Sequence, residues 1–205
     1  MPNSDRSAPL SRDRIVAEAR LQLSEEGLDQ MSLRRLANRL GVTAPALYAY
    51  VTDKQDLLAE VAETGFGELL ARFEAIPADD PAEVLREMAR VYVGYALEHP
   101  SVFRVMFQSP PSTLHVPEAS TLDGATAVFT WSAGAVATAQ AAGVIHPDRD
   151  PAMASLVLWT ASHGSASVLL LGAPDGNVRE IPEFDGLVDA VVDAALLGLA
   201  QPPSS

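Results

Sequence analysis

The stretch that decides the fold is residues 31–58, which read MSLRRLANRLGVTAPALYAYVTDKQDLL. From Leu33 to Leu40 the apolar residues recur at the i, i+3, i+4, i+7 spacing of one helix face. Ser32 stands at the N-cap position before this face. Gly41 follows it, where a helix end favours a left-handed backbone. The pattern therefore predicts a short amphipathic helix over this stretch.

A second short helix follows after a three-residue turn. Thr43 is a suitable N-cap, and Pro45 fits the first helical turn, where a missing N–H does little harm. Leu47 is the apolar residue able to pack back onto the preceding helix. We expect this second helix to run over 44–50. Two short helices joined by a turn that contains glycine form a helix-turn-helix, whose second helix enters the major groove of DNA.

The side chains of the second helix suit close approach to a groove about 12 Å wide. Ala44 and Ala46 are small and able to meet thymine methyl groups. Thr43, Tyr48 and Tyr50 offer hydroxyl groups to phosphates or bases. Together these residue types predict that the second helix contacts DNA.

Two cations flank this pair of helices. Arg34, at the start of the first helix, is able to reach a groove or a phosphate. Lys54, the only lysine in the chain, begins the next helix, where its ammonium adds to the positive end of the helix dipole and favours a phosphate. The alternative is that Lys54 pairs with Asp53 or Asp56.

Three other residues near the motif have simpler interpretations. Arg35 and Arg39 are expected to lie on a solvated helix face and to form ordinary ion pairs. The alternative for Tyr48 is that it partly packs against the helix pair. A helix-turn-helix that serves protein binding, or that has lost its role, is the minority interpretation of the motif.

The rest of the chain divides into helices as well. A glycine follows each of several apolar-periodic stretches, and prolines fall at the boundaries between stretches. No hairpin pattern with alternating flanks occurs, so strands are not needed. We predict an all-α fold of nine helices, over about 11–26, 33–40, 44–50, 53–75, 81–98, 100–108, 119–142, 149–171 and 185–200. The longest loops are expected at 109–118 and 173–183.

The composition narrows the class of protein. The chain has 205 residues, of which 48% are hydrophobic, as in a globular protein of one or two domains. It has no cysteine, which excludes a disulfide scaffold, a thiolate metal site and a cysteine nucleophile. The polar start lacks the apolar core of a signal peptide, and no apolar run approaches the ~18 residues of a membrane span. We therefore expect a cytoplasmic protein without membrane contact.

The charge is distributed unevenly along the chain. The net charge is −13, which taken alone argues against nucleic acid as a partner. Residues 1–57, however, carry as many basic as acidic groups, so the whole excess belongs to residues 58–205. This asymmetry predicts two functional halves. We expect a DNA-binding domain over 1–57, with a flexible arm over 1–10, and a second domain over 58–205.

The N-terminal motif resembles the TetR family of bacterial transcriptional regulators over residues 11–60. The run LYxYVxxKxxLL from Leu47 to Leu58 is similar to the family signature around the recognition helix, and Gly41-Val42 before a capped helix also matches. Tyr50 stands where the family often has histidine. The resemblance implies base contacts from Arg34, Thr43, Ala44, Pro45 and Ala46, and backbone contacts from Tyr48, Tyr50 and Lys54. The small alanines favour some shape readout.

The later part of the chain contains a second motif. Trp159 and His163 are four residues apart and share a helix face, and Gly164 follows them. This trio resembles the WHG-type C-terminal domain of part of the TetR family, as does Glu98-His99-Pro100 with Phe103 and Met106. The resemblance implies a domain that binds an effector and forms a dimer.

The regulatory domain offers candidate residues for both tasks. Aromatic walls with a few polar anchors suit an apolar pocket, although most aromatic residues lie in cores by default. His163 is either a ligand contact or a core histidine hydrogen-bonded across the bundle. The expected effector pocket comprises Tyr92, Tyr95, Met106, Trp131, Trp159 and His163. The expected dimer interface comprises Gly164, Val188, Val191, Val192 and Leu196.

These observations favour a homodimeric, ligand-responsive transcriptional regulator, most simply a repressor. It would bind a palindromic double-stranded operator and leave it when a small-molecule effector binds. No cofactor and no metal is expected. The first alternative is an all-helical protein-interaction module without sequence-specific DNA binding.

The second alternative is a metal-dependent helical enzyme. Asp148 and Asp150 lie near His146, but the metal-ligand spacing along a helix is lacking. No nucleophile elbow or phosphate-binding glycine loop is present. We therefore expect no enzymatic activity. The four histidines are scattered, at His99, His115, His146 and His163.

Overall fold

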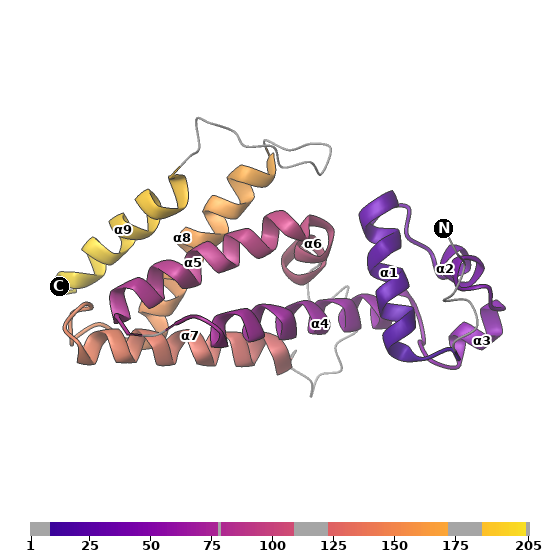
Figure 1. Cartoon of the computed structure of the whole chain (residues 1–205), viewed down its shortest axis with the longest axis horizontal. Helices are drawn as coiled ribbons and strands as arrows, with labels where there is room; N and C mark the ends of the chain where they lie inside the picture. Colours follow the sequence, from indigo (N-terminus) through magenta and orange to yellow (C-terminus); the bar gives the residue numbers. More distant parts are fainter. Residues whose placement is uncertain (1–8, 78, 109–122, 172–185, 204–205) are drawn as a thin grey trace. The chain divides into compact units, whose positions relative to one another are not determined.

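The computed structural model of the chain describes residues 9–77, 79–108, 123–171 and 186–203. Within these residues the chain forms nine α-helices and no strand, which confirms the all-α prediction (Figure 1). The predicted helix residues 119–122 and the predicted loops at 109–118 and 173–183 lie outside the described residues. The helices are α1 Arg12–Glu26, α2 Leu33–Leu40, α3 Ala44–Tyr48, α4 Lys54–Glu74, α5 Pro81–Glu98, α6 Pro100–Gln108, α7 Asp123–Ala141, α8 Pro151–Leu171 and α9 Leu187–Ala200.

The chain divides into two compact units. The first comprises Met1–Gly65 and Ser101–Asp123, and the second comprises Phe66–Pro100 and Gly124–Ser205. The division differs from the predicted boundary after residue 57, because the first turns of α4 and most of α6 belong to the N-terminal unit. The units describe packing only, so the predicted division into a DNA-binding and a regulatory domain stays a prediction.

The first unit is built around one face of α1. Ile15, Ala19 and Leu23 have no exposed surface, as the apolar stripe predicts. Ser11 caps α1 by accepting a hydrogen bond from the Arg14 N–H, and the helix ends at Gly27, whose φ of 79° suits glycine. The unit also contains fully buried residues of α2, α3, α4 and the link between α3 and α4, namely Leu36, Leu47, Leu57, Val61 and Val51.

Close packing of α6 on α4 in this unit requires a glycine. A Cβ atom at Gly65 would lie 2.7 Å from Met106 Sδ and 3.0 Å from Val102 Cγ1. Both distances are tighter than ordinary van der Waals contact, so Gly65 is what permits the approach. Met106 is itself buried by this contact.

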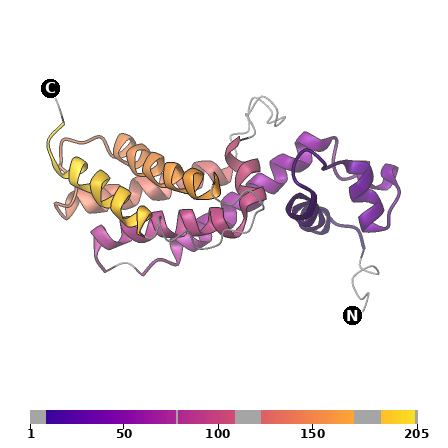
Figure 2. The same ribbon diagram turned by 90° about the horizontal axis from the view of Figure 1, so that it is seen from above.

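In the second unit α5, α8 and α9 lie side by side, as the two views show (Figures 1 and 2). Leu85, Leu158 and Val192 are almost fully buried among them. Ion pairs tie α5 to α9: Arg86 Nε lies 2.7 Å from Asp193 Oδ1, and Arg90 Nε lies 2.7 Å from Asp189 Oδ1. The pKa of each arginine is raised, chiefly by these hydrogen bonds.

Residues of the link between α7 and α8 donate hydrogen bonds to the C-terminal end of α9. Arg149 donates hydrogen bonds to the carbonyl of Gly198, in the last turn of α9, and to that of the C-cap Gln201, where a cation complements the helix dipole. The His146 N–H donates to the Leu199 carbonyl at 3.0 Å. The C-terminal helix is therefore held at its end as well as along its length.

α8 is long and apolar enough, by length and composition alone, to cross a membrane. This differs from the expectation that no segment approaches a membrane span. Core helices of soluble proteins pass the same test, and the buried side chains of α8 pack against α5 and α9. The helix is a poor membrane candidate for that reason.

Candidate functional site

The helix-turn-helix forms as predicted from its caps. Ser32 Oγ accepts from the Arg35 N–H at 3.3 Å, and α2 ends at Gly41 with φ 70° and ψ 28°. Thr43 Oγ1 accepts from the Ala46 N–H at 3.4 Å and so begins α3. Leu47 is fully buried and anchors α3. α3 ends at Tyr48 rather than at residue 50, because the chain turns there.

Several of the expected DNA contacts are exposed on this unit. Tyr48 exposes 54% of its surface, so it points to solvent rather than into the core. Arg34, Thr43 and Pro45 are exposed. The two small residues of α3, Ala44 and Ala46, are half-buried. Arg34 forms no hydrogen bond or ion pair with any other residue that the structure describes. These side chains are available to a partner.

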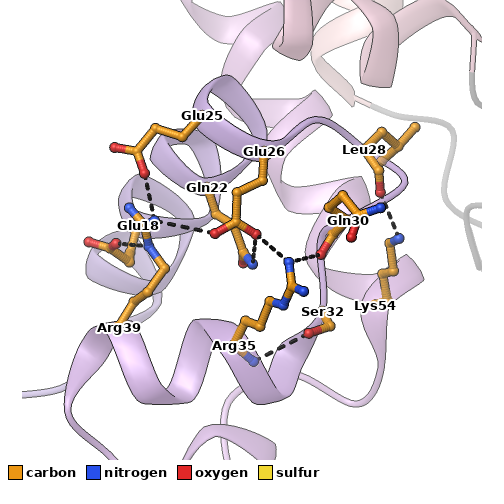
Figure 3. A network of polar contacts seen from close by, with 10 residues as sticks. All are labelled: Glu18, Gln22, Glu25, Glu26, Leu28, Gln30, Ser32, Arg35, Arg39 and Lys54. Carbon is orange, nitrogen blue, oxygen red and sulfur yellow. Dashed lines mark hydrogen bonds and ion pairs between the residues drawn. The ribbon is translucent and has the colours of Figure 1, made fainter.

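The other arginines of α2 bind carboxylates of α1 (Figure 3). Arg39 Nε lies 2.6 Å from Glu18 Oε1, and Arg39 Nη1 lies 2.6 Å from Glu25 Oε2. The hydrogen bonds that Arg39 donates to Glu25 and then to Glu18 raise the pKa of Arg39 further above its ordinary value. Arg35 lies 3.0 Å from Glu26. The ion pairs expected of Arg35 and Arg39 are thus present and join α2 to α1, but Arg39 is half-buried and does not lie on a solvated face.

Glu26 is the acceptor at the centre of this network. It accepts from Gln22 at 3.1 Å and from Arg35 at 3.0 Å. These hydrogen bonds, the one from Gln22 first, hold the pKa of Glu26 below its ordinary value. Glu26 is therefore charged at neutral pH.

Tyr50 and Lys54 have partners inside the unit. Tyr50 Oη donates to the Leu10 carbonyl at 2.9 Å, and Lys54 Nζ donates to the Leu28 carbonyl at 2.9 Å. Asp53 and Asp56, the alternative partners of Lys54, cap the start of α4 instead. Sequence patterns did not reveal these bonds, since each joins positions that are far apart in the chain. The predicted phosphate contacts of Tyr50 and Lys54 remain predictions.

In the second unit, three of the expected pocket residues form a hydrogen-bonded chain. Trp159 Nε1 donates to Tyr92 Oη at 3.1 Å, and Tyr92 Oη lies 2.9 Å from His163 Nδ1. An indole N–H only donates, so the Tyr92 oxygen accepts from Trp159. The Tyr92 hydroxyl and His163 Nδ1 share the second hydrogen bond, whose donor depends on the tautomer of the histidine ring.

Burial keeps both Tyr92 and His163 in their neutral forms near neutral pH. Burial raises the pKa of Tyr92 well above its ordinary value. Burial lowers the pKa of His163. The hydrogen bond between Tyr92 of α5 and His163 of α8 agrees with one of the two interpretations of His163, a histidine hydrogen-bonded across the bundle. A ligand contact by His163 remains a prediction.

The remaining expected pocket residues lie elsewhere. Tyr95 is fully buried and donates to Glu68 Oε2 at 2.9 Å. The Trp131 ring packs on Phe73, with ring centroids 5.2 Å apart. Met106 belongs to the first unit, where it meets Gly65. The structure thus groups three of the six candidates.

The expected dimer residues divide in the same way. Gly164 is exposed, and Val188 and Val191 are half-buried. Val192 and Leu196 are buried within the chain itself. The exposed apolar side chains that sequence patterns did not single out lie mainly on α8: Met153, Leu156, Val157, Val168 and Leu171, with Leu197 on α9.

The residues considered for a metal enzyme have structural roles. Asp150 Oδ1 accepts from the Met153 N–H at 2.8 Å and so caps α8. His146 Nδ1 accepts from the Asp148 N–H at 3.2 Å. Within the part of the chain that the structure describes, no three or more His, Asp or Glu side chains gather as metal ligands would. His115 lies outside that part.

Two family models match the chain. Residues 15–61 match the model described as bacterial regulatory proteins, tetR family, and residues 85–195 match a tetracyclin repressor-like C-terminal domain. These two ranges include the helix-turn-helix and most of the second unit.

Similar proteins agree with the models. The HTH-type transcriptional regulator Rv1816 of Mycobacterium tuberculosis is 31% identical over 140 residues, which cover 66% of this chain and 58% of that protein. The chain thus spans less than two thirds of the length of this curated relative.

Solved structures share the fold. A protein of unknown function from Rhodococcus sp. RHA1 is 30% identical, with a TM-score of 0.77 over 97% of this chain and 100% of that one. A TetR variant from Acinetobacter baumannii AYE, solved in complex with minocycline, is 24% identical. It has a TM-score of 0.65 over 96% of this chain and 100% of that one.

Proposed function

Because the chain belongs to the TetR family of bacterial transcriptional regulators, we propose that it is a ligand-responsive, homodimeric repressor of a palindromic operator. The observation that carries this proposal is the capped helix-turn-helix, whose exposed side chains include Arg34, Thr43 and Tyr48. Regulators of this family bind DNA and are not enzymes, and we extend this to the present chain. We propose that it works in the cytoplasm, where the operator lies.

The start of α3 enters the major groove of each half-site in this proposal. Thr43, Ala44, Pro45 and Ala46 then meet base edges, and Tyr48 meets the backbone. Small side chains leave few donors for direct readout, so thymine methyl contacts and DNA shape supply much of the specificity. Arg34, exposed and unpaired among the described residues, reaches a phosphate or a base.

A second copy of the chain covers α8 in the proposed dimer. α8 exposes six large apolar side chains, Trp159 among them, and its sequence contains no Asp, Glu, Lys or Arg. Two copies that each carry a net charge of −13 repel one another. An uncharged, apolar helix face is where they approach most readily. A two-fold axis would then place the recognition helices about 34–36 Å apart, or a multiple of it, which matches a palindrome.

A small-molecule effector releases the operator in this proposal. The TetR variant from Acinetobacter baumannii holds minocycline, which supports an effector site in the second unit of this chain. We place the site beside the hydrogen-bonded trio of Trp159, Tyr92 and His163, whose aromatic rings and polar atoms are of the kind that line effector pockets. Release requires only that the effector binds one conformation more tightly than the other.

Fluorescence anisotropy tests this function. The purified full chain is titrated against duplexes from upstream of its own reading frame, and against a random duplex library if none of these binds. We expect dimer binding at ~10⁻⁸ M or tighter, and a several-fold loss in Arg34→Ala. Arg104→Ala, which removes an exposed arginine of α6, is the matched control and should bind normally. Equal binding of all sequences would instead favour the protein-interaction module.

A further inference from the structure

We propose that Tyr50 and Lys54 are positioning residues, which act on DNA binding by holding the two ends of α1. Tyr50 lies in the link between the recognition helix α3 and α4, and Lys54 is the first residue of α4. Both residues bond to backbone carbonyls just outside α1. The inference rests on the proposed DNA binding. It changes what two polar residues of the family signature do in this chain.

Tyr50 holds the beginning of α1. Its hydroxyl donates to the carbonyl of Leu10, the residue before the N-cap Ser11. The contact is reciprocal, since Arg12 donates from its guanidinium to the Tyr50 carbonyl. Arg12 also pairs with Glu60 of α4. The first turn of α1 is thus joined to the residues that follow α3.

Lys54 holds the other end of α1. Its ammonium donates at 2.9 Å to the carbonyl of Leu28, which follows the C-cap Gly27 (Figure 3). Lys54 is half-buried there, at the first residue of α4. Asp53 and Asp56 hold that helix start in place by capping it. The capped start of α4 therefore fixes the position from which Lys54 reaches the Leu28 carbonyl.

The two ends of α1 matter because α3 is short. Only Leu47 of its five residues is buried, and a helix of one or two turns has little stability of its own. The orientation of α3 depends on the helices that surround it, and α1 is the one against which α2 is paired through Arg35 and Arg39. A loose end of α1 would therefore loosen the angle at which α3 meets the groove.

Donor chemistry separates positioning from phosphate contact. A tyrosine hydroxyl has one proton, and a phosphate oxygen only accepts, so Tyr50 cannot donate to a phosphate while it holds Leu10. A lysine that neutralises a phosphate releases counterions, and its loss flattens the log–log salt dependence of affinity by about 0.9. A lysine that only positions α1 leaves that slope unchanged.

Hydrogen exchange of the DNA-free full chain is the first measurement. Tyr50→Phe should speed exchange in the first turn of α1, residues 12–16, and Lys54→Met should speed it in residues 27–32. Arg34→Met, which removes an exposed cation without a partner among the described residues, should leave both segments unchanged. Unchanged exchange in Tyr50→Phe and Lys54→Met would overturn the proposal, and no operator is needed to see it.

Operator affinity at several salt concentrations is the second measurement. Tyr50→Phe and Lys54→Met should each weaken binding about tenfold, as expected for loss of one hydrogen bond of this kind, with the wild-type salt slope. Arg34→Met should flatten the slope by about 0.9. The same flattening in Lys54→Met would overturn its positioning role. If the wild-type chain selects no operator, the proposed function fails, while the exchange result still decides whether the two residues hold α1.

Discussion

Arg39 Nε donates to Glu18 Oε1 across 2.6 Å, so that the last cation of α2 is engaged by α1 and not by solvent. Only about a quarter of each side chain is exposed. Glu25 shares the same guanidinium. The helix-turn-helix is therefore held from behind by charge as well as by its apolar core.

Replacing Arg39 with methionine should destabilise the DNA-free protein. Loss of the charge-assisted hydrogen bonds leaves two carboxylates near each other, which should lower the free energy of unfolding by about 1–2 kcal/mol. Urea denaturation followed by circular dichroism, at one protein concentration, measures this. Arg34→Met is the control from the same helix, and its change should stay within about 0.5 kcal/mol. Equal losses in the two variants would mean that the network contributes no stability.

Local patterns predicted the helices well because the signals that begin and end them are local. Ser32, Gly41 and Thr43 are caps that act within a few residues, and each has the predicted role. The bond from Tyr50 to Leu10 crosses 40 positions, and no periodicity reports such a pair. Long-range partners depend on the packed fold rather than on the chain near each residue.

α8 limited prediction for another reason. The helix is apolar nearly all round, so its pattern does not tell which side faces the core. Its exposed residues, such as Met153 and Val157, were consequently not among the expected dimer contacts. On α9 the expected contacts Val192 and Leu196 are buried within the chain, because a broad apolar face contains both kinds of position.

Two glycines of α4 give a matched pair of substitutions. Gly65→Ala gains helix propensity but places a Cβ 2.7 Å from Met106 Sδ, whereas Gly67 has nothing within 4 Å of such an atom. Gly67→Ala should raise the free energy of unfolding by about 0.5–1 kcal/mol. The free energy of unfolding of Gly65→Ala, measured by urea denaturation, should lie about 1–2 kcal/mol below that of Gly67→Ala. Similar gains in both variants would show that α6 yields without cost.

Burial of His163 should make the free energy of unfolding depend on pH. Burial lowers the pKa of folded His163 below its ordinary 6.5, so the unfolded chain binds more protons once the pH falls through 6.5. The free energy of unfolding should therefore be independent of this group above about pH 7 and should fall as the solution is acidified. Denaturation of wild type and His163→Gln at several pH values isolates the effect as a difference between the two curves.

The comparison with His163→Gln removes the contribution of other titrating groups, and a second variant tests the role of the hydrogen bond. Acidification also neutralises part of the −13 charge, but His163→Gln shares that change, so it cancels in the difference. Tyr92→Phe removes the hydroxyl hydrogen-bonded to His163 Nδ1 while the histidine stays. Because burial is what lowers the pKa of His163, the pH-dependent difference should remain in this variant. A difference that does not vary with pH would mean that His163 titrates alike in the folded and unfolded chains.

Adding a side chain at Gly164 should separate folding from dimerisation. A Cβ atom there meets nothing within 4 Å in the chain, and the residue is exposed on α8. Gly164→Leu should therefore leave the free energy of unfolding of the monomer unchanged or higher, yet hold two copies apart where small residues let helices approach closely. Sedimentation velocity should detect monomer at concentrations where the wild type is a dimer. Leu21→Glu, at an exposed apolar position of α1, should remain dimeric. If Gly164→Leu dimerises as the wild type does, α8 is not the dimer face around Gly164, and the exposed apolar residues of α8 have another partner.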